Sequence, residues 1–114
     1  MEQRNWIKSF PGTIIVCDDK GIIVEMNDHA VESFQKEGGA GLLGTNILDC
    51  HPEPSRSKLS EMLKNHTANI YTVEKSGLKK FIYQVPWYQD DTYAGFVELS
   101  LPIPCEIPHF VRKG

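Results

Sequence analysis

The 114-residue sequence has few of the features that build covalent or metal-linked scaffolds. Its cysteines, Cys17, Cys50 and Cys105, are odd in number, lie far apart and form no C-x-x-C pair. This pattern argues against a disulfide framework and a thiolate zinc site, and it suits the reducing cytoplasm. No two of the four histidines are four residues apart, so none would pair as metal ligands on one helix face. We therefore expect a cytoplasmic protein without a metal site.

Long apolar runs are also missing from the chain. No segment approaches the ~20 apolar residues that span a bilayer, and residues 1–10 lack the apolar core of a signal peptide. The formal net charge of −3 argues against a nucleic acid as partner. A content of 40% hydrophobic and 24% charged residues is typical of a globular domain, and the length predicts one such domain.

Two short β-branched runs near the N-terminus predict a β-hairpin. Residues 13–18 (TIIVCD) and 21–26 (GIIVEM) flank a turn that contains Asp19 and Gly21. Asp can hydrogen-bond to its own backbone and Gly tolerates positive φ, which are the properties that a tight turn needs.

Three helical segments are predicted next. The first is capped within residues 27–28 (Asn-Asp) and ends before the glycines at 38–41. Residues 42–50 favour one or two brief helical turns. A longer helix runs from Pro54 to about His66, because Pro suits the first turn of a helix. Its apolar stripe consists of Leu59, Met62, Leu63 and His66.

Three strands complete the prediction. Residues 69–75 (NIYTVEK) and 78–87 (LKKFIYQVPW) are joined by a Ser-Gly turn, and a polar turn at 89–95 then leads into 96–101 (FVELSL). Pro86 cannot donate a ladder hydrogen bond, so a bulge or an unpaired edge is expected there. Alternation in the second strand predicts one face with Phe81, Tyr83, Val85 and Trp87 and another with Ile82 and Gln84.

The order β-β-α-α-α-β-β-β predicts an α+β fold. It would be one five-stranded antiparallel sheet with short helices on one face, because each helix has a single apolar side to bury. A small ligand cavity can form between the helices and the sheet. Residues 102–114 contain three prolines and no helical period, which predicts an irregular tail.

Several motifs occur in an order that resembles the PAS domain. PGTIIVCDDKGIIVEMN resembles the opening hairpin of that family, and DDTYAGFVELSLPI resembles its last strand. LLGTNILDCHPE resembles the segment that leads into a short helix ending in His-Pro-Glu. The resemblance covers residues 10–101, flanked by an N-terminal cap segment at 1–9 and the Pro-rich tail at 102–114. The Cys-His-Pro version is also similar to PAS modules of bacterial regulators that accompany hemerythrin-like domains.

The resemblance implies a cytoplasmic, non-enzymatic module for sensing and signal transduction, with no catalytic residues. Such domains commonly form homodimers through an N-terminal segment or the outer sheet face, and their pockets hold haem, flavin or a small organic molecule. We therefore expect a homodimer that binds a small organic ligand or a signalling protein, and neither nucleic acid nor membrane. The many aromatic residues of the last strands fit this view, since an exposed aromatic patch usually marks an interface.

Three cofactor motifs are weak in this sequence. GAGLLG, residues 39–44, matches G-x-G-x-x-G, but a predicted helix precedes it where a dinucleotide site needs a strand. Light-sensing PAS domains carry a flavin-reactive Cys three residues after a Gly, where this chain has Ile47 after Gly44. Haem-binding relatives use a His in the middle of the long helix, whereas His51 precedes that helix and His66 ends it. Haem and flavin are therefore not expected.

The segment LDCHPEPSR, residues 48–56, places Cys50 beside His51. Adjacent side chains generally project in different directions, and a nucleophile needs a base within hydrogen-bond reach. One Cys-His pair also falls short of the three or four ligands of a zinc site. A proline-stiffened turn between two helices is the main interpretation. The alternative is a small redox- or metal-responsive protein that uses Cys50 and His51.

The main hypothesis places any ligand between the helices and the sheet. Its contacts would be mostly apolar, with a tyrosine hydroxyl or the thiol as a polar handle. The predicted wall consists of Phe34, Ile47, Cys50, Met62, Leu63, Tyr71 and Tyr83.

Overall fold

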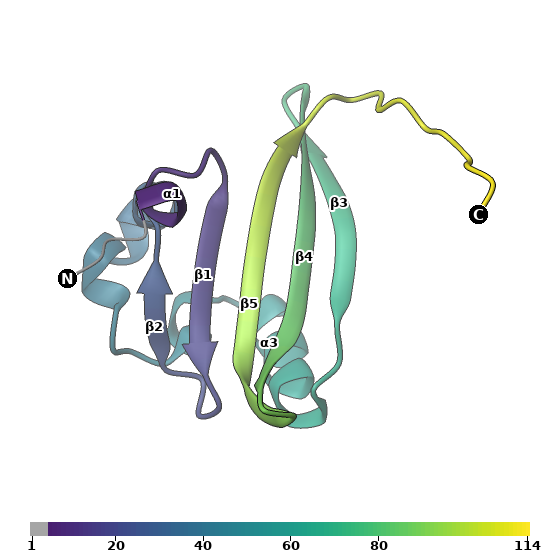
Figure 1. Ribbon diagram of the computed structural model, residues 1–114. Helices are drawn as coiled ribbons and strands as arrows, with labels where there is room; N and C mark the ends of the chain where they lie inside the picture. The colour runs from purple at the N-terminus through teal and green to yellow at the C-terminus, as the bar shows by residue number, and fades with distance from the viewer. Residues whose placement is uncertain (1–4) are drawn as a thin grey trace.

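A computed structural model describes residues 5–114, so the first four residues of the predicted cap segment lie outside the described part. One antiparallel sheet has the strand order β2-β1-β5-β4-β3 (Figure 1). The strands are β1 (Thr13–Asp18), β2 (Ile23–Met26), β3 (Asn69–Lys75), β4 (Leu78–Gln89) and β5 (Thr92–Ile103). The predicted five-stranded antiparallel sheet is therefore confirmed.

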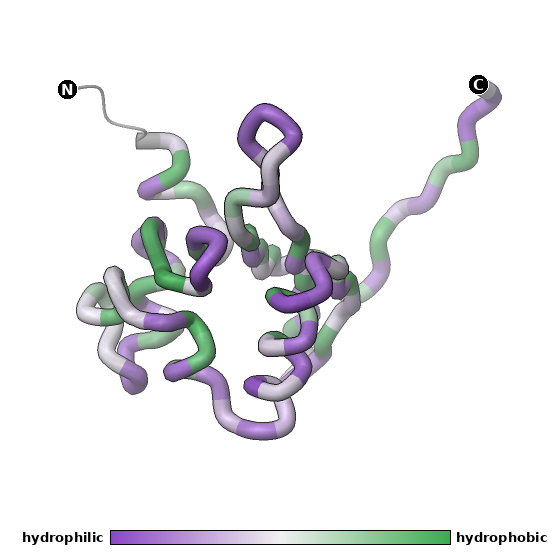
Figure 2. The backbone as a smooth tube through the Cα atoms, turned by 90° about the horizontal axis from the view of Figure 1, so that it is seen from below, coloured by the Kyte–Doolittle hydropathy of each residue, from purple (hydrophilic) through white to green (hydrophobic). Residues whose placement is uncertain are grey.

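The α-helices are α1 (Asn5–Lys8), α2 (Asp28–Ser33) and α3 (Ser55–Asn65). Three 3-10 turns, η1 (Gln35–Glu37), η2 (Gly39–Leu42) and η3 (Ile47–Cys50), connect α2 to α3. Viewed from below, α2 and α3 lie on one side of the sheet (Figure 2), as the sequence predicts. Within residues 5–114, no helix is long and apolar enough to span a membrane.

The last hairpin is longer than the sequence predicts. The polar turn shrinks to Asp90 and Asp91, which have φ of 50° and 67°, and β5 starts directly after them. Asp tolerates this left-handed conformation better than most residues. β5 also continues to Ile103, two residues past the predicted end of the domain, and residues 104–114 have no regular secondary structure.

The irregularity predicted at Pro86 is confirmed. β3 pairs with β4 only as far as Gln84, so Pro86 has β5 as its partner strand. The β4–β5 register then shifts between Trp87 and Tyr88. Pro86 therefore sits where its missing N–H removes little pairing.

The hydrophobic core lies between α2, α3, the 3-10 turns and the sheet face that they cover, here called the inner face. Cys17 and Phe96 lie opposite each other on β1 and β5 and both point into this core. The buried cluster consists of Ile15, Cys17, Ile23, Ala30, Leu42, Ile47, Leu59, Met62 and Phe96.

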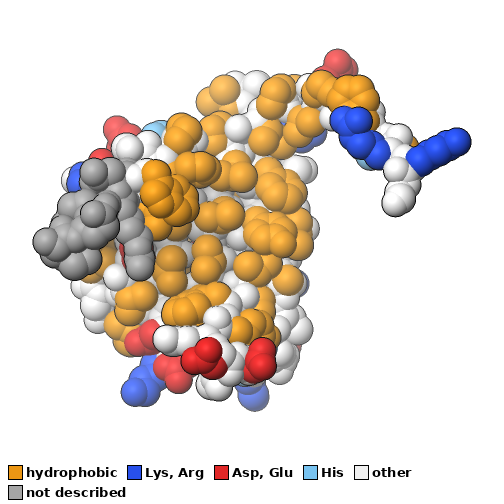
Figure 3. All heavy atoms as spheres, in the orientation of Figure 1, with side chains coloured by type: hydrophobic (Ala, Val, Ile, Leu, Met, Phe, Trp, Pro, Cys, Tyr) orange, Lys and Arg blue, Asp and Glu red, His pale blue; other side chains and the backbone are white. Residues whose placement is uncertain are grey.

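The other side of the sheet, here called the outer face, carries a broad field of apolar side chains (Figure 3). Cross-strand pairs such as Val16 with Val97 and Tyr83 with Leu99 follow the alternation of the strands. The apolar residues of this face are Ile14, Val16, Val24, Ile70, Phe81, Tyr83, Val85, Trp87, Val97, Leu99, Leu101 and Ile103. Ile14 is buried, and each of the others is at least partly exposed. No helix of the described chain covers this face as α3 covers the inner one.

Asn27 joins the chain before β1, β1 itself and α2. Its Oδ1 accepts hydrogen bonds from the Ile14 and Ala30 N–H groups, both at 3.0 Å, and its Nδ2 donates to the Gly12 carbonyl at 2.8 Å. The residue is 2% exposed and is the N-cap of α2, as the sequence allows. One amide thus satisfies three buried backbone groups from separate segments.

We predict that Asn27→Ala lowers the free energy of unfolding by about 2–3 kcal/mol, because it removes a cap and leaves buried backbone groups unpaired. Urea denaturation measures this loss. His29→Ala, which changes an exposed residue on the same helix, should stay within about 0.5 kcal/mol of the parent. Equal stability of the two variants would contradict the role given to Asn27.

Gly95 allows β4 to reach β1 across β5. It lies opposite Asp18 of β1 and Trp87 of β4, with φ of 147°. A Cβ at this position would overlap the carbonyl oxygen of Cys17. The same oxygen accepts a hydrogen bond from Trp87 Nε1 at 3.2 Å. The Trp87 side chain therefore passes over Gly95 of β5 and binds β1 on the far side of that strand.

We predict that Gly95→Ala destabilises the fold strongly, by more than about 2 kcal/mol, because both the backbone conformation and the space exclude a side chain. The matched control is Gly41→Ala, where an added Cβ meets no atom within 4 Å. Thermal and urea unfolding of both variants check this expectation. If the Gly95→Ala protein were as stable as the control, the close approach of the Cys17 carbonyl to Gly95 would not be required for stability, which would contradict this prediction.

Candidate functional site

A small cavity lies between α3 and the inner face of the sheet. Its volume is about 130 Å³, enough for about four water molecules at ~30 Å³ each. It is lined by His51, Ser55, Lys58, Leu59, Met62, Asn69, Tyr71, Gln84 and Glu98. Most of these side chains are polar, so the cavity differs from the apolar pocket that the sequence predicts.

Three polar side chains cross the sheet side of this cavity on neighbouring strands. Asn69 of β3 lies opposite Gln84 of β4, which lies opposite Glu98 of β5. Asn69 Nδ2 donates to Gln84 Oε1 at 3.0 Å, and Gln84 Nε2 donates to Glu98 Oε1 at 3.2 Å. These three residues are called the polar ladder below. The ladder ends on a carboxyl group, which when ionised is the strongest acceptor of the three.

The helix side of the cavity offers donors of the complementary kind. Lys58 and Ser55 belong to α3 and supply an ammonium group and a hydroxyl group. Tyr71 of β3 adds a phenol, and burial together with the nearby Glu98 raises the pKa of that phenol. A molecule in the cavity would therefore meet Lys58 and Ser55 on the helix side, and the Tyr71 phenol and the Glu98 carboxyl group on the sheet side.

Cys50 and His51 meet, contrary to the expectation from their adjacent positions. Cys50 Sγ lies 3.5 Å from His51 Nδ1, and both atoms approach the Ile47 carbonyl oxygen, at 3.3 Å and 2.8 Å. A carbonyl oxygen only accepts, so His51 Nδ1 carries a proton and donates it to this bond. Nδ1 therefore has no lone pair with which to take the proton of the thiol.

The surroundings of Cys50 also disfavour a reactive thiolate. Burial, and then the Glu98 charge, raise the pKa of the Cys50 thiol above its ordinary value. The thiolate is the nucleophile and the metal ligand, so a raised pKa opposes both roles. Within residues 5–114, no group of three or more His, Cys, Asp or Glu side chains is arranged to hold a metal ion. These observations count against the redox or metal alternative.

The predicted wall residues divide into three groups. Met62 and Tyr71 line the cavity. Ile47 belongs to the buried core, and three others pack against that core, namely Phe34, Cys50 and Leu63. Tyr83 is misplaced in the prediction, because β4 turns Ile82 and Gln84 toward α3 and Tyr83 toward the outer face, where it is 37% exposed.

Sequence reasoning did not select the polar ladder or Lys58. A signal was present, since Gln84 lies two residues after the buried Ile82 and Glu98 two residues after the buried Phe96. Strand alternation places each pair on one face, so polar residues at core-facing positions identify the floor of the cavity. The prediction gave more weight to the apolar residues of β4, which lie on the opposite face.

Comparisons with known proteins place this geometry in a known fold. No family model and no curated protein matches the chain. Among solved structures, a sensory box sensor histidine kinase from Vibrio cholerae has a TM-score of 0.65 at 16% identity, over 90% of this chain and 89% of that chain. The PAS domain of BvgS from Bordetella pertussis has a TM-score of 0.63 at 20% identity, over 88% and 82%.

A third solved structure is the Aer2 receptor from Vibrio cholerae, described as a dual PAS-haem oxygen sensor. It has a TM-score of 0.54 at 17% identity and covers 81% of this chain and 94% of that chain. The resemblance seen in the sequence therefore extends to the three-dimensional fold, and the chain has the fold of a PAS domain.

We predict that Glu98→Gln makes Cys50 react faster with iodoacetamide, because the removed charge lowers the pKa of the thiol. The measurement uses a Cys105→Ser background, in which the other cysteine, Cys17, is fully buried. In both proteins the rate should keep rising with pH above the range where an ordinary thiol ionises. Glu25→Gln on β2 is the control, and an equal rate in all proteins would contradict the placement of Glu98 near Cys50.

Proposed function

We propose that this chain, which has the PAS fold, is a non-enzymatic sensory module that binds a small polar molecule beneath α3 and transmits the signal as a homodimer. The polar ladder is the observation that carries this proposal. The three ladder side chains are half-buried on the sheet face that the helices cover, where apolar residues would be expected to pack. A cavity bordered there by a carboxyl group and an ammonium group is poorly suited to simple core filling. A bound polar group explains it better.

The chemistry of the cavity narrows the class of ligand. An amino or hydroxyl group would donate to Glu98, and an acidic group would meet Lys58 and Ser55. The volume of about 130 Å³ restricts the choice to small molecules. Small hydroxy acids and amino acids combine both kinds of group, and they replace the mostly apolar ligand expected from the sequence.

The similar structures support sensing as the activity, since those compared are described as a sensor histidine kinase, a PAS domain and a haem oxygen sensor. Haem is not our proposed ligand here. His51 donates to the Ile47 carbonyl, and the His66 ring stacks on Tyr93 with 3.6 Å between ring centroids. We propose that the module works in a bacterial cytoplasm, in keeping with its unpaired cysteines.

The outer face supports the proposed homodimer. It is a continuous apolar field on one side of the sheet (Figure 3), and α1 adds Trp6, which is 67% exposed. Contiguous apolar surface of this kind is typical of protein interfaces. A signalling protein with its own apolar surface could occupy the same face, as the second candidate partner.

The ligand proposal is tested by thermal unfolding of the chain with a panel of small hydroxy acids, amino acids and apolar compounds of equal size. We predict that members of the polar set raise the Tm, since a ligand at 100 times its Kd stabilises by about 2.7 kcal/mol. Glu98→Ala should abolish the rise, while Glu25→Ala should keep it. Stabilisation by the apolar compounds alone, or a rise that survives Glu98→Ala, would contradict the proposal.

A further inference from the structure

The sheet carries opposite charge at its two ends. The β1–β2 and β4–β5 turns lie at one end and contain four carboxyl groups and one lysine: Asp18, Asp19, Asp90 and Asp91 against Lys20. The β3–β4 turn, its flanks and residues 104–114 lie at the other end. They contain five cationic side chains and two glutamates: Lys75, Lys79, Lys80, Arg112 and Lys113 against Glu74 and Glu106. The molecule therefore runs from an acidic end to a basic end. On the outer face Lys79 is paired with Glu74, whereas Lys75 and Lys80 lie on the inner face. The cations that remain for a partner on the outer side are Arg112 and Lys113 of the tail.

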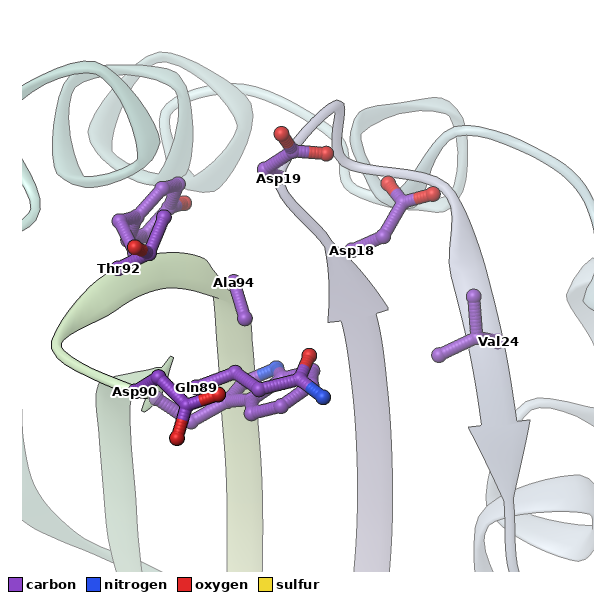
Figure 4. A pocket seen from close by; sticks show the side chains of 9 residues that line it. Asp18, Asp19, Val24, Gln89, Asp90, Thr92 and Ala94 are labelled. Atoms are coloured by element: carbon purple, nitrogen blue, oxygen red, sulfur yellow. The ribbon is translucent and has the colours of Figure 1, made fainter.

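The acidic end is hollowed into a groove of about 580 Å³. Asp18 and Asp19 stand on one side of it and Asp90 on the other (Figure 4). Val24, Trp87 and Ala94 give the groove an apolar part of its lining. This groove, called the acidic groove below, would accept a segment that combines apolar and cationic side chains.

The C-terminal tail, residues 104–114, is such a segment. It is held at its start, where Lys79 Nζ donates to the Cys105 carbonyl and Cys105 Sγ donates to that of Gly77. Beyond that point it leaves the domain on the side away from α2 and α3 (Figures 1 and 2). Phe110 and Val111 are 71% and 87% exposed and directly precede Arg112 and Lys113.

The tail cannot place its basic end in the groove of its own domain. From Cys105 to Arg112 the chain reaches at most ~25 Å when fully extended. The strand from Ile103 down to Ala94 is already ~30 Å long at ~3.3 Å per residue. A second copy is therefore the occupant that fits this groove, provided that its basic end lies over the acidic end of the first.

We propose that two copies pack outer face to outer face with their strands antiparallel, so that the tail of each copy lies in the acidic groove of the other. This inference rests on the proposed homodimer and adds its orientation. The two-fold axis would pass near the middle of β5, over Val97 and Leu99. A parallel arrangement would bring like charges together at both ends, which opposes association.

Disulfide trapping tests the orientation directly, using the exposed native Cys105 and one new cysteine per variant. Thr92→Cys, at the acidic end, should give a dimer band under oxidising conditions that disappears when Cys105→Ser is added. Thr72→Cys, on β3 toward the basic end, is the matched control and should give no band above the parent. A band with Thr72→Cys and none with Thr92→Cys would overturn the proposal.

Charge reversal gives a second, independent test. We expect Arg112→Glu with Lys113→Glu, or Asp19→Lys with Thr92→Lys, to weaken self-association about tenfold at low salt. An equimolar mixture of the two variants should recover most of the parent affinity, because opposite charges meet again. Lys36→Glu with Lys64→Glu, in η1 and α3, should change little. Sedimentation measures each Kd, and circular dichroism confirms that each variant is folded.

The outcomes separate this inference from the proposal on which it rests. A monomer at every concentration would contradict the homodimer itself. A dimer that is insensitive to both charge reversals would leave the homodimer standing and would overturn its antiparallel orientation.

Discussion

The fold depends on the pairing of β1 with β5, whose partner residues lie between 77 (Asp18 with Gly95) and 87 (Thr13 with Ser100) positions apart in the chain. β1 and β2 form one hairpin, β3 to β5 form a meander, and the β1–β5 ladder joins the two into a single sheet. A side-chain hydrogen bond fixes each end of the β1–β5 pairing. Asn27 holds the start of β1 against α2, and Trp87 reaches over Gly95 to the Cys17 carbonyl at the other end. Because both side chains bind buried backbone groups, the register of β1 against β5 cannot shift by one residue without breaking these hydrogen bonds.

The same pairing decides which side of the sheet the helices cover, and the sequence could not decide this. Its patterns predicted the hairpin turn from Asp19 and Gly21 and the long helix from one apolar stripe, since local backbone chemistry sets both. Alternation in β4 shows two faces but does not say which is buried. The more apolar set, with Tyr83 and Val85, lies outside, whereas Gln84 and Glu98 lie under α3. Apolar content is therefore a poor guide to the buried face of a sheet that carries an exposed apolar field on one side and a polar cavity on the other.

The segment around Cys50 shows the same limit at atomic scale. Spacing alone predicts that adjacent side chains diverge, yet η3 ends so that Cys50 and His51 both approach the carbonyl of Ile47. Ile47 is the first residue of η3, and its carbonyl points along the turn toward residues 50 and 51. A carbonyl oxygen has two lone pairs, so it can accept from side-chain donors placed there. Two groups that look like a nucleophile and its base are in fact two donors to one acceptor. The sequence could predict the turn, whereas the roles of its side chains depend on a backbone oxygen that no motif specifies.

In the proposed module, the period of a β-strand couples the cavity to the outer face. Gln84 lies between Tyr83 and Val85, and Glu98 lies between Val97 and Leu99, so each ladder residue alternates with residues of the outer face. A ligand that draws the ladder toward α3 must move the same backbone that carries the apolar field. No separate relay is needed, because successive residues of β4 and β5 face opposite sides of the same sheet. A polar contact beneath the helix can thus alter how two copies fit, which is the minimum that a sensor built on one sheet requires.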